Sequence, residues 1–279
     1  MVPIPNHLTK ETASFNYSYD PTSNSWLPTN SADWSISVAE NKISGYRLVR
    51  KFGRNPDIDT ATDPEDVWYG GDLMNWVTTP SAISINSSYT GDVSSGNGAI
   101  NLVVEGLLSG TWAQNVETVA LKGRTTATTT GKYTRVNRAY ISGVNTYHGS
   151  NLGSLTGTIN SQRMFTIPSG AGQTQIARYT VPSGKTAYLA YVALGISSSK
   201  VANITMYKYE NANDVTPPYN GAGKRVVINF DGVGTRQYFA PPVPQDNFPE
   251  MTDLWWAVDN VSANDTSVDV NFGLWVIDN

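Results

Sequence analysis

The sequence predicts an all-β protein, and three observations support that prediction. Thr, Val, Ile and Tyr, which favour strands, outnumber the Ala, Glu, Lys, Leu and Arg that dominate helical bundles. Short runs of alternating apolar residues recur between turn-forming residues, at intervals of about 8–12 residues. No stretch of about twelve residues or more keeps a clean helical period. We therefore expect two tandem antiparallel β-sandwich or jelly-roll-like domains, preceded by an extended N-terminal arm.

The arm is expected over residues 1–44, because its prolines forbid a continuous helix and its periodicity is weak. It nevertheless carries five aromatic residues, among them Trp26 and Trp34. A disordered tail seldom holds so many aromatic side chains, so the arm is expected to dock. The sequence leaves two alternatives open, which are docking on its own body and docking on a neighbouring subunit.

The first domain is expected over residues 45–160 and opens with an ordered, aromatic-anchored loop at 51–76. Phe52, Trp68 and Trp76 provide the anchors, and Asn55-Pro56 is a typical turn start. The second domain is expected over residues 161–279, with a boundary near 157–168 that the turn-forming segment 166–172 marks. Its clearest candidate strands share apolar alternation and lie at 186–196, 201–209, 254–261 and 268–277.

Composition excludes several classes of function. Charged residues make up 15% of the 279 residues, and the net charge of −4 argues against a general nucleic-acid binder. Cys is absent, which excludes disulfides, thiolate zinc sites and cysteine nucleophiles. No run approaches the ~20 apolar residues of a membrane span, and the N-terminus lacks the pattern of a signal peptide. We expect no cofactor, no nucleic-acid partner and no membrane partner.

Catalytic patterns are equally scarce. The sequence has two histidines, and it lacks the Gly-x-Ser-x-Gly elbow and a complete phosphate-binding loop. The best candidate for an ion site is the acidic group Asp57, Asp59 and Asp63, whose hard oxygen ligands would suit Ca²⁺. Because the EF-hand spacing fails and basic residues lie just upstream, a salt-bridged loop is the preferred interpretation. We therefore predict no metal and no enzymatic activity.

Adjacent tryptophans provide a rival hypothesis. Trp255 and Trp256 must point to opposite faces of a strand, so one of them is expected in the core and the other at the surface. An exposed indole stacks well on a sugar or on a protein partner. A carbohydrate-binding or adhesin module, with a surface glycan as its partner, is therefore an alternative. A glycan-degrading enzyme is the weakest alternative, because nothing singles out a pair of carboxylates.

One segment resembles a known group of proteins. KFGRNPDIDT at 51–60, followed by PEDVW at 64–68 and Gly70-Gly71, resembles a phrase found in structural proteins of tailed bacteriophages, especially marine ones. ETVALKG at 117–123 and RVNRA at 135–139 are also similar, and the resemblance extends over roughly residues 45–279. It implies a β-rich virion component that is assembled in the host cytoplasm, and it implies no catalytic residue.

We therefore predict a non-enzymatic virion structural protein, most specifically a capsid decoration protein. It would form a homo-oligomer, with a trimer as one candidate, and bind the major capsid protein or other virion proteins. A position in the neck, the tail or a fibre base is the alternative within the virion. The residues predicted to contact neighbours are Trp26, Trp34, Phe52, Arg54, Trp68 and Trp76.

Overall fold

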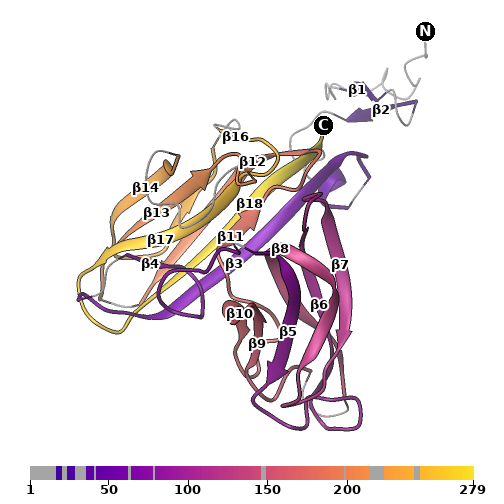
Figure 1. Cartoon of the computed structure of the whole chain (residues 1–279). Helices are drawn as coiled ribbons and strands as arrows, with labels where there is room; N and C mark the ends of the chain where they lie inside the picture. Colours follow the sequence, from indigo (N-terminus) through magenta and orange to yellow (C-terminus); the bar gives the residue numbers. More distant parts are fainter. Residues whose placement is uncertain are drawn as a thin grey trace, which may run out of the picture.

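A computed structural model confirms that the protein is all-β and antiparallel. It describes residues 17–20, 24–28, 36–40, 42–61, 64–77, 79–145, 149–197, 199–213, 223–241 and 246–279. These residues form a two-sheet sandwich, a separate six-stranded sheet and a small N-terminal hairpin (Figure 1). No helix in the described ranges is long and apolar enough to span a membrane.

The sandwich consists of two packed sheets. One has the order β15-β12-β18-β3, with β16 also paired to β12, and the other has the order β11-β17-β13-β14, with β4 also paired to β17. The strands are β3 (Tyr46–Ile58), β4 (Glu65–Asp66), β11 (Arg178–Thr180), β12 (Lys185–Ile196), β13 (Ala202–Tyr209), β14 (Arg225–Val233), β15 (Gln237–Phe239), β16 (Asn247–Phe248), β17 (Asp253–Val261) and β18 (Thr266–Asp278).

Apolar alternation along β18 shows why this sandwich forms. The side chains of Val268, Val270, Phe272, Leu274 and Val276 are buried in the core between the two sheets, whereas the residues between them are mostly partly exposed. A strand places alternate residues on opposite faces, so this pattern requires one covered face and one outer face. Each large apolar side chain buried here stabilises the fold by about 1.5–3 kcal/mol.

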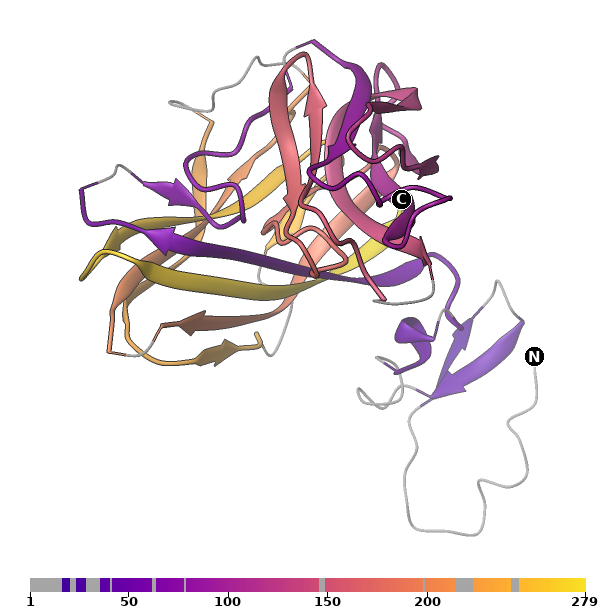
Figure 2. The same ribbon diagram turned by 90° about the horizontal axis from the view of Figure 1, so that it is seen from below.

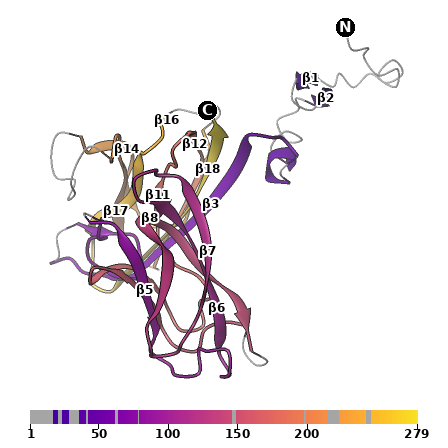
Figure 3. The same ribbon diagram turned by 45° about the vertical axis from the view of Figure 1, so that its right-hand side comes forward.

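The six-stranded sheet encloses a core of its own. Its order is β10-β9-β5-β8-β6-β7, and Figure 3 shows how it curls into a half-barrel. The largest fully buried side chains of this module include Tyr133 and Phe165. The strands are β5 (Ser81–Ser87), β6 (Ala99–Leu108), β7 (Gln114–Ala120), β8 (Ala127–Val144), β9 (Leu155–Ile159) and β10 (Gln162–Ile167).

The path of the chain divides the modules differently from the predicted boundary near residue 160. Residues 45–160 were expected to form one domain, but β3 pairs along its length with β18, from Tyr46↔Ile277 to Ile58↔Thr266. Figure 2 shows these two strands side by side. The curled sheet is thus an insertion between β4 and β11 of the sandwich. Pairing between strands so far apart in sequence leaves no local signal.

The predicted turn at Asn55-Pro56 does not form, because both residues lie within β3. Proline is tolerated there since β3 is the last strand of its sheet and the β3–β18 register shifts between Thr266 and Val268.

Within the predicted arm, two short strands pair with each other. β1 (Tyr17–Asp20) and β2 (Ser25–Pro28) form a two-stranded sheet that includes no other described strand. A helical turn follows at residues 36–39, and its Val38 is fully buried. The arm therefore contains regular structure where the sequence predicted only an extended chain.

Candidate functional site

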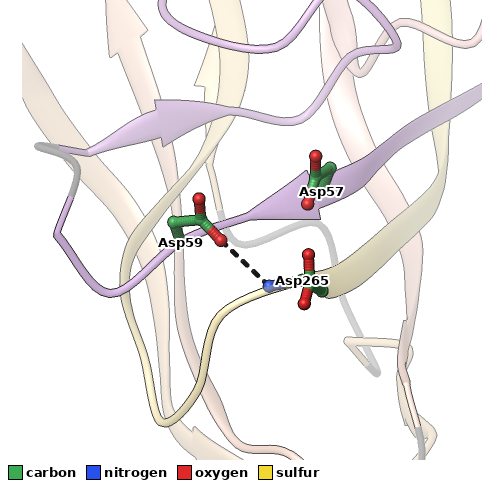
Figure 4. Close-up of side chains that lie close together, drawn as sticks. All are labelled: Asp57, Asp59 and Asp265. Carbon is green, nitrogen blue, oxygen red and sulfur yellow. Dashed lines mark hydrogen bonds between the residues drawn. The ribbon is translucent and has the colours of Figure 1, made fainter.

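Three aspartates meet at one tip of the sandwich (Figure 4). Asp57 lies near the end of β3, Asp59 follows that strand, and Asp265 precedes β18. Pairing of Ile58 with Thr266 brings the three together, and one oxygen of each lies within 4.8 Å of the others. The backbone N–H of Asp265 donates to Asp59 Oδ1 at 3.0 Å.

The electrostatics of this tip match crowded carboxylates. The pKa of Asp57 is raised, first by desolvation within the cluster and then by the negative charges of Asp59 and Asp265. The sequence predicted Asp57 and Asp59 as members of this group. The third predicted residue, Asp63, lies outside the described residues. Asp265 was not predicted, because it is about 200 positions away in the sequence. Exposed carboxylates at this spacing offer oxygen ligands to a hard cation, but they occur widely without one.

Trp68 and Trp76, predicted to contact neighbours, lie inside the protein instead. They are 2% and 9% exposed and belong to an aromatic cluster between the two modules. Trp76 meets Trp255 edge-on, with ring centroids 5.5 Å apart. Both residues are in the linker that runs from the sandwich into the insertion, so covering them joins the modules. Their predicted role is corrected to internal packing.

A buried ion pair spans the same junction. Arg135 on β8 donates from Nη2 to Asp253 Oδ2 at 2.8 Å and from Nε to both carboxylate oxygens, and the two side chains are 3% and 0% exposed. The Thr180 hydroxyl also donates to Asp253. The guanidinium carbon of Arg135 lies 5.2 Å from the ring centroid of Trp76 and 4.9 Å from that of Trp112. Because buried charges are tolerated only when paired, this contact fixes the two modules in one arrangement.

Arg178 completes the junction. Its guanidinium donates to the carbonyl oxygens of Val136, Asn75 and Met164, at 3.2, 3.0 and 2.9 Å. Burial lowers its pKa from 12.5 to about 10, with Arg135 as the next cause. The sequence contained no signal for these contacts, since a lone arginine usually lies at the surface.

Asp66 is a second buried charge near the junction. It is 2% exposed, and burial raises the pKa of its carboxyl to about 7, although the Met74 N–H donates to Oδ2 at 2.6 Å and lowers the pKa. The carboxyl therefore titrates near neutral pH rather than near its usual value of 3.8.

The other predicted contact residues are scattered. Phe52 is half-buried on β3, and its carbonyl accepts a hydrogen bond from the Ile176 N–H. Arg54 is exposed and donates from Nε to Ser267 Oγ at 3.2 Å. Trp26 is partly buried on β2, and Trp34 lies outside the described residues. The five predicted residues that the structure describes therefore do not share one surface.

Burial also removes the predicted sugar-stacking surface on β17. Trp255 is 5% exposed and Trp256 is fully buried, so neither indole is open to a sugar. The two tryptophans do point to opposite faces, as expected, but the junction cluster covers the face of Trp255 and the sandwich core covers that of Trp256.

A cationic groove missed by the sequence analysis follows β3. Two hollows of about 160 and 350 Å³ are both lined by Arg50, Lys51 and Arg138. Lys51 is only 6% exposed and donates to the Asn137 carbonyl. Burial, followed by the charges of Arg138 and Arg178, lowers the pKa of Lys51 to about 7. Arg138 comes from β8, so only the three-dimensional fold could reveal this grouping.

Comparisons with other proteins add little to this geometry. No family model and no curated protein matches the chain. Among solved structures, the chain is similar to one from infectious bursal virus-derived T=1 particles, at 10% identity over 85% of this chain and 79% of that chain. The TM-score of this match is 0.14, which is too low to support any argument.

Proposed function

We propose that the protein is a non-enzymatic structural component of a virion that forms homo-oligomers and decorates a shell of major capsid protein. The resemblance of residues 51–71 to structural proteins of tailed bacteriophages supports the assignment to a virion. The buried Arg135–Asp253 junction supports a structural role, since it makes one rigid body of two β modules. A position in the neck, tail or fibre base is the alternative within the same class.

The N-terminal hairpin is the observation that carries the oligomeric part of the proposal. β1 and β2 form a sheet of two strands with four residues each, and they pair with no other strand in the described ranges. A hairpin of this size is at best marginally stable in water unless another surface packs against it. A neighbouring protein can provide that surface, as expected for an arm that docks on another subunit.

The base of the arm is already attached to its own body. Val38 in the helical turn is fully buried, while Ile36 and Ala39 border a hollow with Trp275 and Tyr238 on the outer face of the sandwich. Ile36 is 55% and Tyr238 is 70% exposed, so an apolar surface continues beyond the turn. We therefore assign the turn to the chain's own body and the hairpin to a neighbour.

Deletion of residues 1–28 tests this proposal, because it removes the hairpin and keeps the turn that holds Val38. Near-UV circular dichroism of the junction tryptophans checks that the body remains folded. The mass in solution should fall to that of a monomer, and binding to capsids that lack the protein should be lost. An unchanged oligomeric mass together with unchanged capsid binding would refute the assembly role. Failure of specific antibodies to label intact particles would refute the virion assignment.

A further inference from the structure

A continuous furrow lies along the N-terminal half of β3. It consists of three hollows of about 250, 160 and 350 Å³, and each shares lining residues with the next. Arg47 and Val49 connect the first two, and Arg50, Lys51 and Arg138 connect the second and the third. We refer to the surface around Tyr46–Phe52 as the β3 furrow. Its opposite wall comes from the inserted module and includes Glu105, Gln114 and Asn137.

Main-chain groups are available along this furrow. β3 is an edge strand of its sheet. On the side of β18, the Gly45 carbonyl accepts a hydrogen bond from the Asp278 N–H. The Phe52 carbonyl accepts from Ile176 on the opposite side. Since main-chain groups alternate along a strand, those of Leu48 and Arg50 also point away from β18. In the described part of the chain, these groups have no backbone partner on that side.

Positive charge dominates the walls. Arg47, Arg50, Lys51 and Arg138 line the furrow. Glu105 is the acidic residue among the lining residues of the second and third hollows, and Asp278, which lines the first, is paired with Lys185. None of the four cations forms an ion pair with a described residue. This contrasts with the chain as a whole, which has a net charge of −4.

Lys51 indicates that the furrow is built for an anion. Its side chain is almost entirely removed from solvent, and its hydrogen bond within the described residues goes to the neutral Asn137 carbonyl. A buried ammonium group is costly unless an anion or several acceptors compensate it. Arg138 is already oriented, because it donates to Gln173 Oε1 at 2.7 Å and stacks over Tyr140.

We propose that the β3 furrow binds an extended acidic segment of a partner polypeptide, which adds as a strand beside Leu48 and Arg50. Free N–H and C=O groups at the strand repeat match a peptide backbone, which is the basis of recognition by strand addition. The peptide's carboxylates would meet Arg50, Lys51 and Arg138. At about 3.4 Å per residue, the length of β3 from Tyr46 to Lys51 accommodates about six residues.

This inference deepens the proposed function and rests on it, since it gives the chemistry of the partner segment. Its test uses the isolated full chain and a synthetic peptide, so that it is separate from the assembly experiment. If peptide binding fails while deletion of residues 1–28 still abolishes assembly, only the β3 furrow proposal is refuted.

The probe is an acetylated, amidated hexapeptide of alternating Glu and Val, measured by calorimetry at low salt. It should bind the wild-type chain, and the double variant Arg50→Glu, Arg138→Glu should weaken binding by about tenfold or more. Arg236→Glu is the matched control, because Arg236 is exposed and lies outside the lining of the furrow; it should change affinity by less than about twofold. Glu105→Gln should strengthen binding by removing a like charge.

Two further probes separate strand addition from simple charge attraction. Methylating the amide nitrogens of the Glu residues and those of the Val residues gives two isomers, and strand addition requires that one of them loses binding while the other keeps it. An oligogalacturonate of equal charge should bind more weakly than the peptide. Equal binding of the oligogalacturonate, equal behaviour of the two methylated isomers, or no binding of the parent peptide would each overturn the proposal.

Discussion

The junction between the modules makes a quantitative prediction about Asp253. Its carboxylate accepts three hydrogen bonds from Arg135, at 2.8, 3.0 and 3.1 Å, and a fourth from the Thr180 hydroxyl. Asp253→Leu removes these acceptors and leaves the guanidinium buried without its counter-charge. Breaking a buried pair in this way costs about 3–5 kcal/mol. For a chain of this size, such a loss corresponds to a fall in Tm of roughly 10 °C.

The assay is urea unfolding followed by near-UV circular dichroism, which reports the tryptophans that surround Arg135. The double variant Arg135→Met, Asp253→Leu should recover at least half of the lost stability, because both charges are then gone and the apolar side chains can pack against the aromatic cluster. An exposed pair is the control: Lys185 and Asp278 are 27% and 59% exposed, and Asp278→Ala should cost less than about 1 kcal/mol.

Two results would refute this reasoning. One is a loss below about 1 kcal/mol for Asp253→Leu, which would mean that the pair is weak in spite of its burial. The other is a double variant as unstable as the single variant, which would assign the loss to poor packing of the introduced leucine rather than to the orphaned arginine.

Further predictions concern other sites. The folded Asp66 carboxyl retains a proton up to about pH 7, whereas the unfolded chain releases it near pH 4, so the wild-type protein should lose stability between these pH values by up to about 1.4 kcal/mol per pH unit. Asp66→Asn should remove this loss. Tm measured against pH checks the prediction, and parallel profiles for the wild type and the variant would contradict it. Gly53→Ala should unfold the sandwich or cost several kcal/mol, because a Cβ atom there would lie 2.2 Å from the Ala177 nitrogen; a wild-type Tm would show that the close approach is wrong. Asp57→Asn should raise Tm at low salt, with a gain that shrinks in high salt as repulsion is screened; an unchanged or lower Tm at low salt would count against repulsion at the tip.

Local patterns predicted part of this structure well. The strand expected at 268–277 lies within β18 (Thr266–Asp278), and that expected at 254–261 lies within β17 (Asp253–Val261). In these segments, apolar residues at every second position, or a dense run of apolar residues, are enough to identify a strand. The all-β class followed from many such segments.

Features that depend on distant pairing could not be predicted from the sequence. Most of β3 lies where the sequence indicates an irregular loop, because Asn55-Pro56 is a turn signal and the partner strand β18 is about 200 residues away. The burial of Trp68 and Trp76 has the same origin, since their cover comes from Trp255 and Trp112 in distant parts of the chain. The acidic tip was predicted in part, because Asp57 and Asp59 are neighbours in sequence whereas Asp265 is not.

The insertion between β4 and β11 has a consequence for synthesis on the ribosome. β3 emerges early, but its ladder partner β18 lies about 200 residues later in the chain, so the sandwich cannot close until β18 has also been translated. The strands and the core of the inserted module come from one continuous stretch of sequence, so this module can fold before β3 has its partner strand. A premature stop before residue 266 would therefore leave a folded insertion attached to an unpaired cationic strand, and short C-terminal truncations should be far more damaging than loss of the N-terminal hairpin.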